Sequence, residues 1–209
     1  MGRIRSIKNA HELVKSLPLF SDKIKFNNNN KKCCLEIGSG KGDFIIDISS
    51  ANNDTNYIAL EKDATVMLKA LRKANKIIPT PNNLIFINND ADNLKELFGV
   101  TKINKIYLNF SDPWPKRRNE NNRLTCPKFL ELYHQLLEKN GLIEFKTDND
   151  SLYEYSLNIF NKSTLFTISY NTTDLYKDMN ELANNIPTEY EKKFVNAGKN
   201  IYKIILIKH

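Results

Sequence analysis

The sequence is poor in cysteine, with only three in 209 residues: Cys33, Cys34 and Cys126. Their number is odd and no two have the Cys-x-x-Cys spacing, which disfavours both a disulfide framework and a cysteine zinc site. No other cluster of metal-ligating residues stands out, so we expect no metal. This cysteine usage is typical of a reducing compartment, and we expect a cytoplasmic location.

Long apolar runs are also missing. No stretch approaches the roughly 18 residues of a membrane span. The first residues, MGRIRSIKNAHELVKS, have neither the continuous apolar segment nor the small-residue cleavage site of a signal peptide. Hydrophobic residues still make up 41% of the chain, which excludes wholesale disorder. We therefore expect a globular protein without a membrane partner, either a monomer or a homodimer.

Acidic residues are scarce at the N-terminus. Residues 1–32 contain eight basic and two acidic residues and carry most of the formal net charge of +7. A second basic cluster lies mid-chain and consists of Lys116, Arg117, Arg118, Arg123 and Lys128. Basic segments of this kind bind and steer polyanions. For the N-terminal segment a solvated surface is an equally good interpretation, whereas the mid-chain cluster directly follows a Pro-Trp-Pro turn and favours nucleic-acid binding.

Apolar runs alternate with amphipathic stretches from Cys33 onward. They predict strands at 33–37, 56–61, 83–88, 105–110 and 141–147, and helices near 42–50, 64–76, 93–98, 127–138 and 150–161. The alternation predicts an α/β fold with a doubly wound, mostly parallel sheet. Strands at 165–171 and 200–208 indicate an antiparallel C-terminal addition and bring the sheet to seven strands. We interpret residues 1–32, which include the Asn27–Asn30 run, as a basic flexible arm before one domain at 33–209.

The most specific local feature is LEIGSGKGD, where a predicted strand enters a glycine turn and then a helix. The segment fails as a P-loop, because Gly42 rather than Ser or Thr follows Lys41. It also departs from the dinucleotide fingerprint G-x-G-x-x-G, although Glu61 ends the next strand where such folds bind ribose hydroxyls. An ordinary strand-to-helix turn would also explain the glycines, so they do not identify a ligand on their own. The charged residues around the loop are needed to distinguish these interpretations.

Carboxylates stand at the ends of four successive predicted strands: Glu36, Glu61, Asp90 and Asp112. In an open α/β sheet these ends line the ligand crevice. Four acids are a poor site for a pyrophosphate, since like charges repel strongly in a partly dry cleft. They suit ribose hydroxyls, an ammonium group and a positive sulfur. We therefore expect S-adenosyl-L-methionine as cofactor, with S-adenosyl-L-homocysteine as its product, and disfavour an NAD-dependent oxidoreductase.

The segment SDPWPKRR follows the strand at 105–110. Two prolines stiffen the turn that holds Asp112. Trp114 offers a flat surface on which a base can stack, and Lys116 begins a basic run suited to phosphates. We favour this site over the alternative in which Trp114 fills the core and Asp112 caps the next segment.

Two later polar motifs are less specific. Asp148 ends the strand at 141–147, in the same ring of carboxylates. In TEYEKKF, Thr188 and Glu191 have the spacing of a helix-capping box, and the residues alone favour that structural interpretation.

Taken together, LEIGSGKGDF, NNDAD, YLNFSDPWPKRR, RLT, FKTDN and TEYEKKF resemble the tRNA (guanine-N7)-methyltransferase family. The resemblance extends from about Cys33 to the C-terminus. Its DPWPK and TEYE segments are specific, whereas the glycine loop is common to class I methyltransferases. The resemblance implies a Rossmann-like enzyme that transfers a methyl group from S-adenosyl-L-methionine to N7 of guanosine 46 in the variable loop of tRNA.

The resemblance also implies roles for individual residues. The donor-binding set is Glu36, Gly38, Gly40, Glu61, Asp90 and Asp112. The tRNA-binding set is Lys116, Asp148, Thr188, Glu189, Tyr190 and Glu191, which replaces the capping interpretation of the TEYE segment. Where the family carries His and further basic residues, this chain has Asn119, Asn121 and Asn122. This departure predicts a weaker hold on tRNA phosphates.

Guanine N7 has an in-plane lone pair and no proton, so its methylation needs no general base. The reaction is an in-line displacement limited by positioning and electrostatics. Because the product guanine is cationic, a nearby carboxylate stabilises the developing charge, and we assign this catalytic role to Asp112, with Asp148 orienting the base. Two alternatives stay open: a methyltransferase acting on another RNA base, and a non-catalytic RNA-binding module that leaves the strand-end acids unexplained.

Overall fold

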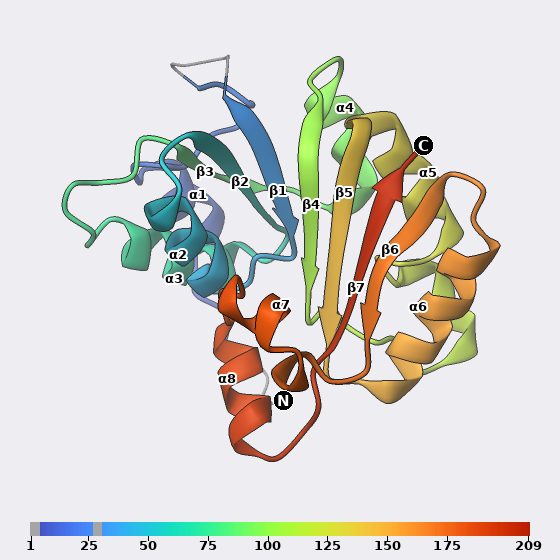
Figure 1. Cartoon of the computed structure of the whole chain (residues 1–209). Coiled ribbons are helices and arrows are strands. Elements are labelled where there is room, and N and C mark those ends of the chain that lie inside the picture. The colour runs from blue at the N-terminus through green and yellow to red at the C-terminus, as the bar shows by residue number, and fades with distance from the viewer. Residues whose placement is uncertain (1–4, 27–30) are drawn as a thin grey trace. The chain divides into compact units, whose positions relative to one another are not determined.

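The computed structural model describes residues 5–26 and 31–209, and the chain divides into two compact units, residues 1–99 and 100–209. The first unit contains α1 (Ala10–Lys15), β1 (Lys32–Ile37), α2 (Asp43–Ala51), β2 (Thr55–Glu61), α3 (Ala64–Ala74), β3 (Leu84–Asn88), the 3-10 helix η1 (Ala91–Asn93) and α4 (Leu94–Phe98). The second contains β4 (Ile103–Asn109), η2 (Arg117–Asn122), α5 (Pro127–Leu136), β5 (Leu137–Thr147), α6 (Asp150–Lys162), β6 (Phe166–Thr172), η3 (Leu175–Lys177), α7 (Met179–Ala183), α8 (Glu189–Asn196) and β7 (Tyr202–Lys208). Figure 1 labels the main elements along the chain.

The strands of the first unit are all parallel and lie in the order β3-β2-β1. Their central residues, such as Leu35, Ile58 and Phe86, are fully buried. Near-continuous apolar strands are typical of a parallel sheet whose faces are covered by helices. The loop after each strand leads into a helix, and Asp63 begins α3 by accepting hydrogen bonds from the backbone N–H groups of Thr65 and Val66 at 2.8 and 3.1 Å.

The N-terminal segment is more structured than the sequence suggests. Helix α1 packs on α3, and Val14 is 1% exposed. The backbone around Phe20 also pairs with β3: Phe86 N–H donates to the Leu19 carbonyl at 2.8 Å, and Ser21 N–H donates to the Phe86 carbonyl at 2.9 Å. The expectation of a free arm is therefore wrong for residues 5–26, because this segment covers the outer strand of the unit. The Asn27–Asn30 run, where we placed the end of the arm, lies outside the described residues.

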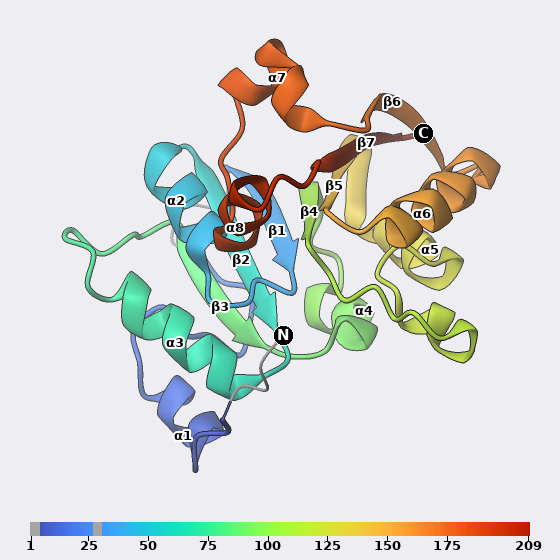
Figure 2. The same cartoon turned by 90° about the horizontal axis from the view of Figure 1, so that it is seen from below.

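The strands of the second unit lie in the order β4-β5-β7-β6. Strands β4 and β5 are parallel, whereas β7 is antiparallel to both β5 and β6. Helix α6 packs on one face of these strands, where the Phe145 and Phe160 rings meet edge to face at 6.1 Å. Helix α7 lies on the opposite side of β5 and β7 from α6 (Figure 2). This arrangement confirms the mostly parallel α/β fold with an antiparallel addition at the C-terminus.

The prediction of elements is complete for the strands and incomplete for the helices. All seven strands overlap their predicted ranges, but α1 and α7 were not expected, and α8 was indicated only by the capping-box interpretation of Thr188 and Glu191. Helices α1 and α7 span only six and five residues, which is too short for a helical periodicity to be recognised in the sequence. Among the residues that the structure describes, no helix has the length and apolar character needed to cross a membrane.

Candidate active site

In the first unit, the predicted glycine loop connects β1 to α2. Gly38 and Gly40 have φ angles of 76° and 58°, which glycine adopts without strain. The N–H groups of Gly38 and Ser39 donate to the Leu60 carbonyl at 2.8 and 3.0 Å, so the loop is fixed to the end of β2. A Cβ atom on Gly38 would meet no atom within 4 Å. The loop is therefore rigidly anchored on one side and open on the other, as a backbone cradle for a ligand requires.

Glu61 is the last residue of β2 and contacts this loop directly. One carboxylate oxygen accepts from the Gly40 N–H at 3.0 Å, and the other accepts from the Asp63 N–H at 2.9 Å. Burial raises the pKa of the Glu61 carboxyl above its ordinary value, and the hydrogen bonds from Asp63 and Gly40 oppose this rise. The structure thus brings together Gly40 and Glu61. Each carboxylate oxygen keeps a lone pair with which it can accept from a ligand hydroxyl.

The two other predicted donor-binding acids of this unit differ in exposure. Glu36 lies within β1 and is 2% exposed, whereas Asp90 follows β3 and is exposed. The Asp90 carboxylate accepts from the Asp92 N–H at 3.1 Å and caps η1. The first unit thus combines an open glycine turn with carboxylates after or within three neighbouring parallel strands, a set that fits hydroxyl groups and positive charge.

In the second unit, the Asp-Pro-Trp turn follows β4. Phe110 N–H donates to the Lys146 carbonyl at 2.9 Å, which ties the start of the turn to β5. Phe110 and Trp114 have positive φ angles of 50° and 43°, a conformation that bulky residues rarely adopt. Such backbone persists only where the surroundings hold it in place. Asp112 lies between these two residues, and its side chain is exposed.

The basic residues after this turn fall into two groups. Lys116, Arg117 and Arg118 are exposed and available to a polyanion. Arg123 is 7% exposed, and its guanidinium donates from Nε to the Pro113 carbonyl at 2.9 Å and from Nη2 to the Trp114 carbonyl at 3.0 Å. The expectation that Arg123 binds phosphate together with its neighbours is therefore wrong, because its donors are directed at the protein backbone.

Asp148 follows β5 as predicted and is only 14% exposed in its side chain. One of its carboxylate oxygens lies 2.6 Å from Lys199 Nζ. Lys199 Nζ also lies 4.8 Å from the centre of the Phe194 ring, so the lysine is placed between the carboxylate and α8. A role of Asp148 in orienting a base therefore depends on its other carboxylate oxygen or on displacement of Lys199.

The TEYE segment begins α8. Thr188 is the N-cap, and its hydroxyl accepts from the Glu191 N–H at 2.9 Å. The Glu191 side chain is fully buried, with Oε2 at 2.7 Å from Lys146 Nζ. Tyr190 stacks on Phe194 with ring centres 6.4 Å apart, and Glu189 is exposed. The geometry thus agrees with the capping interpretation of Thr188, and the tRNA contacts that the resemblance implies for this segment stay a prediction.

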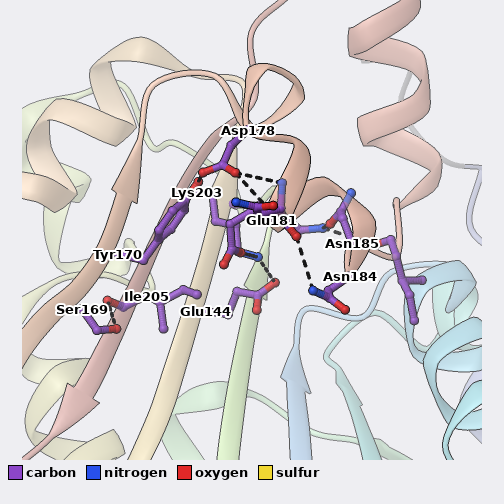
Figure 3. Close-up of polar contacts among 12 residues, drawn as sticks. Glu144, Ser169, Tyr170, Asp178, Glu181, Asn184, Asn185, Lys203 and Ile205 are labelled. Atoms are coloured by element: carbon purple, nitrogen blue, oxygen red, sulfur yellow. Dashed lines mark hydrogen bonds and ion pairs between the residues drawn. The ribbon is translucent and has the colours of Figure 1, made fainter.

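A polar network connects α7 to the sheet of the second unit (Figure 3). Lys203 on β7 binds Glu181 on α7 at 2.8 Å and lies 3.5 Å from Glu144 on β5. Asp178 caps α7 and accepts from the Tyr170 hydroxyl at 2.8 Å. Burial acts to raise the pKa of the Glu144 carboxyl, but the surrounding lysines outweigh it and hold that pKa below its ordinary value.

Sequence reasoning missed this network and the buried Lys146–Glu191 pair. A signal was nevertheless present in the strand GLIEFKT, where Glu144 and Lys146 are two residues apart and therefore share one face. Two opposite charges on one face of an otherwise apolar strand indicate buried partners elsewhere in the chain. Within the described residues, no three His, Cys, Asp or Glu side chains are placed to hold a metal ion.

The fold of the chain is the Rossmann-like α/β fold that solved methyltransferases have. The chain aligns with the 16S rRNA methyltransferase KamB at a TM-score of 0.62 and 12% identity, covering 99% of this chain and 97% of that one. It also aligns with an rRNA methylase from Streptococcus thermophilus at a TM-score of 0.58 and 12% identity, covering 95% and 93%. These likenesses show the fold.

The family follows from sequence comparison. A family model described as "Putative methyltransferase" matches residues 30–204. The chain is 50% identical over 182 residues to a tRNA (guanine-N(7)-)-methyltransferase of Mycoplasma mycoides, covering 85% of this chain and 82% of the relative. It is 42% identical over 208 residues to that of Mycoplasma genitalium, covering 99% of both. The chain belongs to the tRNA (guanine-N7)-methyltransferase family, which confirms the prediction of an S-adenosylmethionine-dependent methyltransferase.

Proposed function

We propose that this enzyme methylates N7 of guanosine 46 in the variable loop of tRNA, in the cytoplasm. The observation that carries the proposal is the exposed carboxylate of Asp112 on a turn with two left-handed bulky residues, in a chain whose family acts on guanine N7. A strained and exposed turn is characteristic of a functional site. The three cysteines are buried and form no disulfide bond, which suits a reducing compartment.

S-adenosyl-L-methionine fits the residues of the first unit, because Gly38 faces open space and the Glu61 carboxylate retains acceptor capacity. We infer that Glu61 accepts from the ribose hydroxyls and that the Gly38–Gly40 backbone lies against the donor. Glu36 and Asp90 complete the proposed donor-binding set of this unit, and Asp112 is the further residue that the family resemblance assigns to the donor. When bound, the cofactor supplies an electrophilic methyl group on a positive sulfur.

The proposed role of Asp112 is electrostatic. Guanine gains a positive charge as N7 is methylated. A fixed carboxylate therefore stabilises the transition state more than the ground state. The stiff turn keeps this carboxylate in place without reorganisation during the reaction. Trp114, on the same turn, offers an aromatic face for stacking a base.

We assign tRNA binding to both exposed and buried groups. Lys116, Arg117 and Arg118 supply positive charge for phosphates next to the Asp112 turn. Asp148 is the proposed contact to the base edge. From the TEYE segment, Thr188, Glu189, Tyr190 and Glu191 are the proposed further contacts, of which the exposed Glu189 is most accessible.

Incubation with a labelled methyl donor and tRNA transcripts tests the proposal, followed by mapping of the modified nucleoside. We expect 7-methylguanosine at position 46, and no product from a matched transcript with adenosine at that position. A methyl group on another base, or on another atom of guanine, would instead support the alternative of a methyltransferase with a different RNA target.

A further inference from the structure

Arg123 differs from the other basic residues near the Asp-Pro-Trp turn. It is 7% exposed, whereas the neighbouring Lys116, Arg117 and Arg118 are exposed. Burial of a guanidinium is costly unless its donors are satisfied by partners in the protein. The partners of Arg123 therefore indicate which structural role its buried guanidinium has.

Two of these partners are carbonyls of the turn itself. Nε donates to Pro113 at 2.9 Å and Nη2 donates to Trp114 at 3.0 Å, so one planar group binds two successive carbonyls. Pro113 and Pro115 have no N–H and cannot contribute backbone donors that would close the turn. Because Trp114 also has a φ of 43°, the turn requires external support, and the fork of Arg123 supplies it.

The rest of the guanidinium is fixed from other directions. Its central carbon lies 4.2 Å from the centre of the Tyr155 ring on α6, and Nη1 lies 3.7 Å from a carboxylate oxygen of Glu120. The following residues are attached to the same helix, since the buried hydroxyls of Thr125 and Ser156 are hydrogen-bonded at 2.7 Å. The turn is thus connected through Arg123 to α6, a helix of the rigid core.

We propose that Arg123 is a positioning residue for methyl transfer, which holds the carbonyls of Pro113 and Trp114 and thereby fixes the Asp112 carboxylate. The catalytic part of this inference rests on the proposed function of Asp112. A lysine at position 123 keeps the charge but has a single ammonium group, which cannot reproduce two parallel N–H···O bonds on adjacent carbonyls. We therefore expect methylation activity to depend on the planar hydrogen-bonding geometry of the arginine side chain and not only on its positive charge.

The test compares Arg123→Lys with the exposed control Arg118→Ala. For Arg123→Lys we expect kcat to fall on the order of 10- to 100-fold, because displacement of a reacting group by about 1 Å has such an effect. The salt dependence of tRNA binding should stay parental. For Arg118→Ala we expect a raised KM for tRNA and a log–log salt slope that is shallower by roughly 0.7–0.9, as for one lost phosphate contact.

The fluorescence of Trp114 reports on the turn without tRNA or donor, because the chain has one tryptophan. Arg123→Lys should shift its emission and increase its quenching by acrylamide, whereas Arg118→Ala should leave both parental. A folded Arg123→Lys variant with parental emission and kcat would overturn the proposal, as would a loss of salt slope equal to that of Arg118→Ala.

A second variant covers the case in which Arg123→Lys does not fold, as judged by its melting curve. Tyr155→Leu removes the stacked ring but leaves the guanidinium and its carbonyl partners, and we expect smaller changes in kcat and emission in the same direction. Parental values for both would overturn the proposal. If the parental enzyme fails to methylate guanine N7, the proposed function falls, while the fluorescence comparison still decides whether Arg123 holds the turn.

Discussion

The buried ion pair between Lys146 and Glu191 gives a direct test of how α8 is held against β5. Both side chains are fully buried, with Nζ and Oε2 2.7 Å apart. Lys146 Nζ also donates to the Asn185 side chain at 3.0 Å, and Glu191 Oε1 accepts from the Tyr176 hydroxyl at 3.2 Å. Glu191→Ala therefore removes the carboxylate that is paired directly with a fully buried ammonium group.

The expected cost follows from that burial. Removal of one member of a buried pair destabilises a protein by about 3–5 kcal/mol, because the other charge stays uncompensated. At about 2–4 °C per kcal/mol for a chain of this size, the melting temperature should fall by about 6–20 °C. The double variant Lys146→Met/Glu191→Leu removes both charges and should recover most of the loss.

Urea denaturation followed by circular dichroism measures these free energies of unfolding. Thr188→Ala is the matched control, since it removes only the N-cap hydrogen bond to the Glu191 N–H and should cost about 1 kcal/mol. A cost below about 1 kcal/mol for Glu191→Ala, or a double variant no more stable than the single one, would refute the reasoning. If Glu191 also contacts tRNA, the restabilised double variant should still bind tRNA poorly.

Three further predictions concern donor binding and charge. Glu61→Ala should weaken donor binding by about 1–3 kcal/mol, the worth of hydrogen bonds to a charged acceptor, and calorimetry showing unchanged affinity would remove Glu61 from the pocket. Because burial raises the pKa of Glu61, its acceptor form is lost at a higher pH than for an exposed glutamate. Donor affinity should thus fall as the pH drops through that raised pKa, and Glu61→Gln should abolish this dependence; a pH-independent parental affinity would contradict it. Replacing the exposed Lys23 and Lys25 by Gln should make the salt dependence of tRNA binding shallower and leave donor affinity unchanged, whereas a parental slope would mean that these charges are only solvated surface.

These lysine substitutions are preferable to removal of the N-terminal segment. Deletion of residues 1–25 would also remove α1, whose Val14 is buried, and the backbone bonds between the segment and β3. A change in tRNA binding after such a deletion could therefore result either from the loss of positive charge or from destabilisation of the first unit, and the measurement would not separate the two.

The strands could be predicted from the sequence because each is an apolar run, such as the one around Ile58, bounded by polar residues. The short helices could not, because their stability comes from tertiary contacts and not from their own periodicity. For helix α8 the capping box indicated the start of a helix but not its packing, because its one fully buried side chain is Glu191, a residue that any pattern of hydrophobicity places outside the core.

The same limit applies to the site. The contact between Glu61 and the glycine loop could be anticipated, since parallel strand ends lie at one edge of a sheet. The buried positions of Arg123 and Lys146 could not be predicted from the sequence. Charged residues are almost never fully buried unless they are paired, and the partners of these two lie far away in the sequence or in a turn. Spacing indicates which residues share an edge or a face, whereas burial of a charge depends on the complete tertiary structure.

The most direct measurement is the single-turnover rate of tRNA methylation by Asp112→Ala, with the melting temperature as a control. The Asp112 side chain is exposed, so its removal should leave the melting temperature unchanged. If its carboxylate stabilises the charge that develops on guanine, the rate should fall by about 100-fold or more, as for other preorganised electrostatic groups. Near-parental turnover by the folded variant would contradict the account.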